Sequence, residues 1–197
     1  MNIFGFWAVK HLTQEKKIIV SSSIANLLSL KSYIIIRGVA HEWLNRSDEV
    51  KWANLISLEK TPLCIHFGGT HQENTGLGLF CKAVEILSNQ ISIDARPICF
   101  HITGIGQLEK IYKLVDKIHN KNIKILINPS CSHYEYMKIL RSCHVSLALK
   151  IPGSEISDTT FPSKVIEITS LGLALISTQV SDVPKIFDDS SAYLLHD

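Results

Sequence analysis

Short apolar runs alternate along the chain with longer segments in which apolar residues recur every three or four positions. The short runs are continuously apolar, which is typical of strands that are buried on both faces of a parallel sheet. We therefore predict strands at residues 17–20, 33–37, 63–67, 98–103, 123–127, 145–149 and 173–177, with a weaker candidate at 193–195.

The longer segments have the period of amphipathic helices. Residues 76–89 place Leu77, Phe80 and Val84 on one stripe, residues 107–119 repeat the pattern, and 134–143 and 163–171 are shorter versions of it. Pro162 is expected in the first turn of the last helix and Gly172 just after its end. Strands that alternate with helices indicate right-handed crossovers, and hence an α/β fold with a Rossmann-like, doubly wound parallel sheet. Before residue 61 the pattern is less regular, with a small helix at 21–30 and a linker or connecting helix at 45–60.

Composition narrows the class of protein. Of 197 residues 46% are apolar and 19% charged, with a net charge of +2, so a sizeable core is expected and a nucleic-acid partner is disfavoured. No apolar run reaches the roughly 18 residues that span a bilayer, and residues 1–9 lack the basic start of a signal peptide. Five cysteines without a Cys-x-x-Cys pair indicate reduced thiols and no metal site. We expect a cytoplasmic protein with at most peripheral contact with the inner face of the membrane.

Two glycine-rich stretches follow predicted strands, where ligands bind in open α/β sheets. Residues 68–76 contain Gly69 and lead into a predicted helix. They suit binding of a phosphate group at the helix N-terminus, and the alternative is an ordinary connection between a strand and a helix. Gly104 and Gly106 form a Gly-x-Gly turn, but Glu109 stands where a dinucleotide fingerprint requires Gly or Ala. A nicotinamide-dependent dehydrogenase is therefore disfavoured, and a tight turn remains the alternative.

A third polar stretch, residues 151–164, leads into the helix that is predicted to start at Pro162. The free N–H groups of such a helix and the charge of Lys164 suit an anionic ligand. Glu167, one turn further on, is placed to accept hydrogen bonds from two sugar hydroxyls, as in ribose recognition. The alternative is that Lys164 and Glu167 are solvated surface charges.

In this order the segments resemble the C-terminal half of group 1 glycosyltransferases of the GT-B fold. The resemblance rests on the turns at 67–69 and 103–106, on the strand at 143–147 and, most specifically, on Phe161-Pro162-Ser163-Lys164-Val165-Ile166-Glu167 with the following 170–178. Residues 180–186 are similar to the family's valine-proline-glutamate-isoleucine segment. Upstream, 18–21 and 34–39 are similar to the last strands before the interdomain linker of the family.

The resemblance implies that residues 1–60 are a remnant of an N-terminal domain with its linker. Residues 61–197 would then be a nucleotide-sugar-binding domain, truncated at its C-terminus. The implied activity is transfer of a sugar from a nucleotide-diphosphate donor to a glycan or lipid-linked acceptor in polysaccharide biosynthesis, without a cofactor. The acceptor would be held by the missing N-terminal domain, so the chain is expected to be inactive alone. The alternative is a non-catalytic or vestigial nucleotide-binding module that needs a partner chain.

The resemblance also implies a set of donor-binding residues and assigns no catalytic residue. The set is Gly69, Thr70, Gly104, Gly106, Asp158, Thr159, Thr160, Phe161, Pro162, Ser163, Lys164 and Glu167. Thr159 stands where the family has its first glutamate, with Asp158 and Glu155 as substitutes, and Thr70 and Thr75 stand where it has two cations.

Histidines and tyrosines give weaker signals. His66 and His101 are expected to be hydrogen-bonded core residues, and His71 and His133 to lie in loops without a role in proton transfer. For Tyr134 and Tyr136 two interpretations remain: one of them borders a bound nucleobase, or both only pack against neighbouring side chains.

Overall fold

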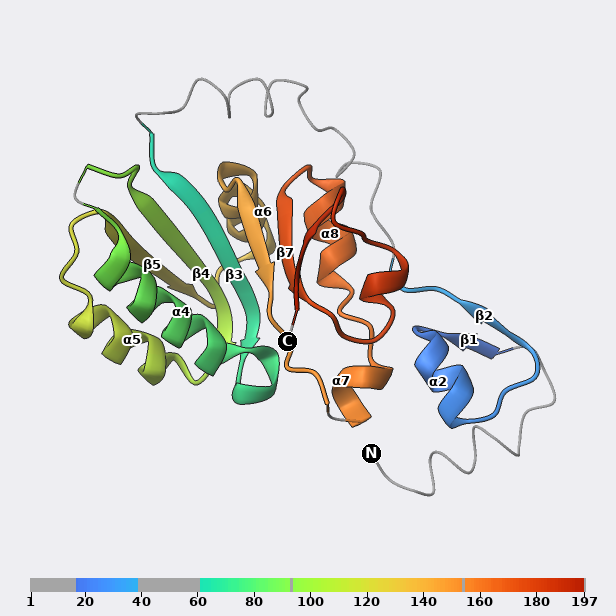
Figure 1. Ribbon diagram of the computed structural model, residues 1–197. Coiled ribbons are helices and arrows are strands. Elements are labelled where there is room, and N and C mark those ends of the chain that lie inside the picture. Colours follow the sequence, from blue (N-terminus) through green and yellow to red (C-terminus); the bar gives the residue numbers. More distant parts are fainter. Residues whose placement is uncertain (1–16, 39–60, 93, 154, 197) are drawn as a thin grey trace.

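The computed structural model describes residues 17–38, 61–92, 94–153 and 155–196. From residue 61 onward the described chain folds into one twisted parallel sheet with helices on its two faces (Figure 1). Across the sheet the strands run β5 (Ile123–Pro129), β4 (Ile98–Gly106), β3 (Leu63–His71), β6 (Val145–Ala148), β7 (Ala174–Thr178) and β8 (Tyr193–Leu195). The order reverses between β3 and β6, as in a doubly wound sheet. The α/β, Rossmann-like fold class predicted from the sequence is confirmed.

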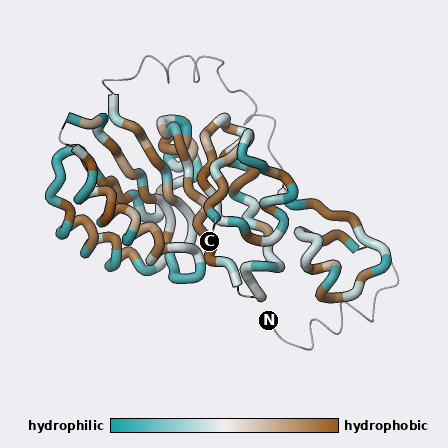
Figure 2. The backbone as a smooth tube through the Cα atoms, in the orientation of Figure 1, coloured by the Kyte–Doolittle hydropathy of each residue, from teal (hydrophilic) through white to brown (hydrophobic). Residues whose placement is uncertain are grey.

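The two faces of the sheet carry separate hydrophobic clusters. On one face α4 (Leu77–Gln90) and α5 (Leu108–Lys117) pack on the strands, and Phe80 stacks on Phe67 with ring centroids 4.5 Å apart. On the other face α6 (His133–Ser142) and α8 (Lys164–Ser170) bury Leu140, Val165 and Ile168. Figure 2 shows the hydrophobic stretches concentrated in the strands between these layers. Burial on both faces explains the continuous apolar runs of the sequence.

Local chemistry sets the helix ends. Ser132 and Glu135 form a reciprocal capping box at the start of α6. Gly172 follows α8 with a φ of +70°, and the Leu173 amide donates to the Ile168 carbonyl, so the expected glycine stop is confirmed. The first helical residue of α8 is Lys164 rather than Pro162, whose carbonyl instead accepts a hydrogen bond from the Val165 amide.

Two predicted glycine-rich loops are in fact strand. β3 continues to His71 and β4 to Gly106, with Gly69 opposite Gly104 and His71 opposite Gly106. A Cβ on Gly104 would lie 2.0 Å from the Gly69 carbonyl oxygen, so glycine lets the two extended strand ends stay paired. The connection to α4 is then only a short 3-10 turn, η2 (Glu73–Thr75), and Gly76. The 151–164 stretch likewise contains a helix that the sequence did not predict, α7 (Glu155–Thr159).

Residues 17–38 form a small unit beside the main sheet. β1 (Lys17–Ile19) and β2 (Tyr33–Ile35) pair in parallel, and α2 (Ser22–Leu27) connects them. The predicted linker at 45–60 and the apolar start of the chain lie outside the described residues. A second 3-10 turn, η3 (Val183–Lys185), follows β7. No helix in the described part of the chain is long and apolar enough to cross a membrane, and the five cysteines are free thiols.

Candidate functional site

A cavity of about 450 Å³ opens at the carboxyl ends of β3 and β4, on the face of the sheet that α6 and α8 cover. Four stretches supply its walls: β3, the end of β4, the connection from β5 with the first turn of α6, and α8. The lining residues are His66, Gly68, Gly69, Thr103, Gly104, Ile105, Ser130, Cys131, His133, Tyr136, Lys164 and Ile168. Glycine at three of these positions keeps side chains out of the space, so backbone is exposed to whatever enters it.

Lys164 is the single lysine or arginine among the residues that line the cavity. Its Nζ donates a hydrogen bond of 3.0 Å to the Gly68 carbonyl and lies 5.8 Å from the centroid of the Phe67 ring. Burial lowers the pKa of Lys164 to about 8. No ion pair among the described residues includes this ammonium. A partly desolvated ammonium whose hydrogen-bond acceptor is neutral has no counter-charge, so it favours binding of an anionic ligand in the cavity that it faces.

His66 forms part of the cavity wall and is kept neutral. Its Nδ1 lies 2.9 Å from the Ser146 hydroxyl and its Nε2 2.8 Å from the Thr103 hydroxyl. Burial, followed by the nearby charge of Lys164, lowers the pKa of His66 to about 3. The predicted hydrogen-bonded core histidine is confirmed, and its place in the cavity wall was missed. For His101 the prediction is wrong in part, because its buried Nδ1 has no hydrogen-bond partner among the described atoms.

Tyr136 and Glu167 join α6 to α8 beside the cavity. The Tyr136 hydroxyl donates to Glu167 Oε2 at 2.8 Å, and its ring meets His66 edge-on, with centroids 5.8 Å apart. Burial and the neighbouring carboxylate raise the pKa of Tyr136, which keeps it a hydrogen-bond donor. Tyr136 lines the cavity, whereas Glu167 does not and reaches it through this hydroxyl. Tyr134, the other tyrosine considered, is 77% exposed.

The structure brings only part of the predicted donor-binding set to the cavity. Gly69, Gly104 and Lys164 line it, whereas Thr70 is exposed at the end of β3, and Gly106 lies at the end of β4. The Thr75 hydroxyl donates to the Thr70 carbonyl, so these two threonines contact each other.

The residues that precede α8 are held by other parts of the chain. Thr159 offers its carbonyl to the Ser21 hydroxyl, Lys150 donates to the carbonyl and hydroxyl of Thr160, and Asp158 accepts from the Gly153 amide. Phe161 is buried in the core, Pro162 is half-buried, and Ser163 is exposed at the N-cap of α8. None of these six residues, 158–163, lines the cavity.

Of the wall that comes from 130–136, sequence reasoning placed His133 at the ligand edge and considered Tyr136, but it missed Ser130 and Cys131. His71, predicted in a loop, is a buried residue of β3 whose Nε2 contacts the Thr103 carbonyl. His133, predicted in a loop, is the first residue of α6, and it lines the cavity together with Ser130 and Cys131. The available signal was position alone: this stretch directly follows a buried strand, at the edge of the sheet where ligands bind.

Comparisons with solved structures decide the fold family. TarM aligns with a TM-score of 0.62 at 11% identity over 91% of this chain, and HepE from Anabaena, in complex with UDP and glucose, with 0.61 at 9% over 90%. The C-terminal domain of LpcC, a group 1 glycosyltransferase from Francisella tularensis, aligns with 0.52 at 16% identity, covering 77% of this chain and 75% of that domain. The chain has the fold of the C-terminal half of a GT-B glycosyltransferase.

The GT-B likeness is one of structure and not of close sequence. No family model and no curated protein matches the sequence. The chain spans 40% of OtsA, 48% of HepE and 33% of TarM, so it corresponds to half or less of each of these proteins. The expectation that it resembles one half of a GT-B protein is confirmed at the level of the fold.

Proposed function

We propose that this chain is the donor-binding half of a glycosyltransferase and that its cavity holds the diphosphate and nucleoside of a nucleotide sugar. The observation that carries the proposal is the half-buried Lys164 ammonium at the cavity, which donates to one carbonyl and has no carboxylate partner among the described ion pairs. A diphosphate supplies the counter-charge that such a cation lacks. HepE, which has the same fold, was solved with UDP and glucose.

Glu167 and Tyr136 are proposed to recognise the ribose. Oε2 of Glu167 already accepts from the Tyr136 hydroxyl at 2.8 Å, which orients the carboxylate toward the cavity wall. A carboxylate accepts several hydrogen bonds, so it can hold Tyr136 and a sugar hydroxyl together. The nucleobase then lies against the stretch around Ser130 and Cys131, and the sugar extends toward Gly69 and Gly104.

The transfer step is proposed to need more than this chain. In the proposal the acceptor is a glycan or a lipid-linked saccharide, held by a second domain of the kind that completes the longer GT-B proteins. The nucleotide sugar is the substrate, and no cofactor takes part. Polysaccharide biosynthesis in the cytoplasm, with at most peripheral contact with the inner face of the membrane, is the proposed setting.

Titration calorimetry with UDP, GDP and ADP tests the donor site. We expect at least one nucleotide to bind the wild-type chain, and Lys164→Met to weaken it about 10- to 100-fold, since a lost charge-assisted hydrogen bond costs roughly 1.5–3 kcal/mol. Lys117→Met is the matched control, because Lys117 is an exposed lysine paired with Glu85. Absence of binding by every nucleotide at millimolar concentration contradicts the proposal, and so does equal affinity for the Lys164→Met variant.

A second candidate is a nucleotide-binding module without catalytic activity that works with a partner chain. Thr70 and Thr75 favour it, because the two positions where the resembling family has cations carry none here and instead contact each other. Lys164 is thus the one lysine or arginine in the cavity wall. Sugar transfer or donor hydrolysis by the purified 197-residue chain alone would exclude this candidate.

A further inference from the structure

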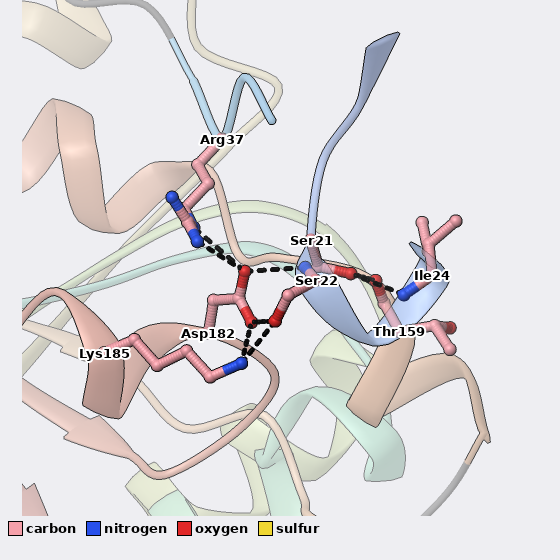
Figure 3. Close-up of polar contacts among 7 residues, drawn as sticks. All are labelled: Ser21, Ser22, Ile24, Arg37, Thr159, Asp182 and Lys185. Atoms are coloured by element: carbon pink, nitrogen blue, oxygen red, sulfur yellow. Dashed lines mark hydrogen bonds and ion pairs between the residues drawn. The ribbon is translucent and has the colours of Figure 1, made fainter. Parts of the chain in front are cut away.

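The carboxylate of Asp182, in the segment that follows β7, accepts hydrogen bonds from three other residues (Figure 3). Oδ2 accepts from the Ser22 amide at 2.7 Å and from Arg37 Nε and Nη2 at 3.0 and 2.7 Å. Oδ1 accepts from the Ser22 hydroxyl and from Lys185 Nζ, the latter at 3.1 Å. The Asp182 side chain is 0% exposed, whereas the side chain of Arg37 is 26% exposed.

These bonds connect parts of the chain that are distant in sequence. Ser22 begins α2 and Arg37 follows β2, so two separate segments of the small 17–38 unit converge on one carboxylate of the main domain. A buried carboxylate is tolerated only when it is paired and its lone pairs are occupied. Removal of its charge therefore leaves Arg37 and Lys185 without their carboxylate partner and weakens this attachment of the unit.

The 17–38 unit also contacts α7 and α8, and Lys164 is the first residue of α8. The Ser21 hydroxyl, which caps α2, donates to the Thr159 carbonyl at the end of α7. A Cβ on Gly38 would lie 3.3 Å from Ile166 Cγ1 and 3.7 Å from Ser163 Cβ, so the backbone after β2 packs directly on the first turn of α8. Lys164 belongs to that turn.

We propose that Asp182 is a positioning residue that latches the 17–38 unit onto α7 and α8 and thereby fixes the first turn of α8, with its Lys164 ammonium, against the cavity. The latch acts through contacts within the chain and does not touch the ligand. Its effect on a bound nucleotide rests on the function proposed above, whereas its effect on α8 does not.

Hydrogen–deuterium exchange on the full chain, with Asp182→Asn, tests the latch. The substitution keeps the shape of the side chain and removes its charge. We expect amide exchange to accelerate about tenfold or more in residues 22–28 and, in the same variant, in residues 163–168, while α4 and β5 keep wild-type rates. Glu85→Gln, which removes the exposed Lys117–Glu85 ion pair, is the matched control and should change neither segment.

A second pair of variants guards against a folding failure of Asp182→Asn. Arg37 is partly exposed, so Arg37→Met should fold, and it should show the same two accelerated segments to a smaller extent, while Arg37→Lys restores protection. Unchanged exchange in 22–28 in these variants overturns the latch. Faster exchange in 22–28 with unchanged 163–168 overturns the positioning role.

Nucleotide affinity separates this proposal from the preceding one. Where UDP, GDP or ADP binds the wild-type chain, Asp182→Asn should weaken it about threefold to tenfold, and Glu85→Gln should not. Coupled exchange without any nucleotide binding by the wild type leaves the latch standing and removes the donor site. Unchanged affinity despite faster exchange at 163–168 overturns the claim that the latch positions Lys164.

Discussion

At the scale of single residues, the burial of Lys164 makes anion binding depend on pH. Because burial lowers the pKa of Lys164 to about 8, the ammonium is charged at neutral pH and neutral well above it. We expect nucleotide affinity to be constant from pH 6.5 to 7.5 and to fall as the pH rises through 8, measured by titration calorimetry up to pH 10. Lys164→Arg stays charged throughout this range and should abolish the fall. A fall of equal size in this variant would assign the pH dependence to another group.

At the scale of elements, the paired glycines at the ends of β3 and β4 shape the floor of the cavity. Gly104 has a φ of +112°, and a Cβ there would lie 2.0 Å from the Gly69 carbonyl oxygen. Gly104→Ala should therefore destabilise the fold by about 3 kcal/mol or more, as measured by urea unfolding. Gly153→Ala is the matched control, since Gly153 also has a positive φ, +84°, but nothing lies within 4 Å of its Cβ position. If both variants lose the same free energy of unfolding, the loss comes from the positive φ alone, and the close approach of the neighbouring strand adds nothing to it.

The same glycines show how far sequence reasoning reaches at this scale. Each predicted strand is present, and α4, α5, α6 and α8 lie where the helical period places them. The ends of β3 and β4 were misassigned because glycine favours a turn when only its own segment is considered. Glycine serves a close strand pair here, and that requirement becomes visible only when the neighbouring strand is known.

The candidate site likewise contains residues that the sequence could identify and residues that it could not. Lys164 was identified from a motif within one segment, and the structure places it at the cavity. Tyr136 and His66 belong to the wall because α6 packs beside β3, a long-range contact with no local pattern. The role of Asp182 was invisible for the same reason, since its partners Ser22 and Arg37 lie about 150 residues earlier in the chain.

At the scale of the whole molecule, buried titratable groups make the stability of the fold fall on acidification, in two windows of pH. His66 has a pKa of about 3, lowered by burial and by the charges of Lys164, His101 and His71, against an ordinary value near 6.5. Between these values the unfolded chain binds a proton that the folded chain does not, so stability declines as the pH falls from 6.5 to 3. His71 and His101, whose pKa values burial also lowers, add to the same window.

Asp182 acts in a second, more acidic window. Burial raises its pKa, but hydrogen bonds from Ser22, Arg37 and Lys185 outweigh burial and hold the pKa at about 2. Its contribution to stability is therefore complete above pH 4 and is lost as the pH falls toward 2.

The two windows can be separated by urea unfolding at pH 7, 6, 5, 4 and 3. From pH 6 to 4 we expect the wild-type free energy of unfolding to fall by up to about 1.4 kcal/mol per pH unit for His66, plus smaller terms from His71 and His101. His66→Gln should flatten this slope, because glutamine does not bind a proton in the unfolded chain at these pH values. Asp182→Asn should keep the slope between pH 6 and 4 and lose only the further decline below pH 4. A His66→Gln variant with the wild-type slope would show that His66 is protonated equally in the folded and unfolded chains, and below its ordinary pKa of 6.5 the wall of the cavity would then carry a second cation beside Lys164.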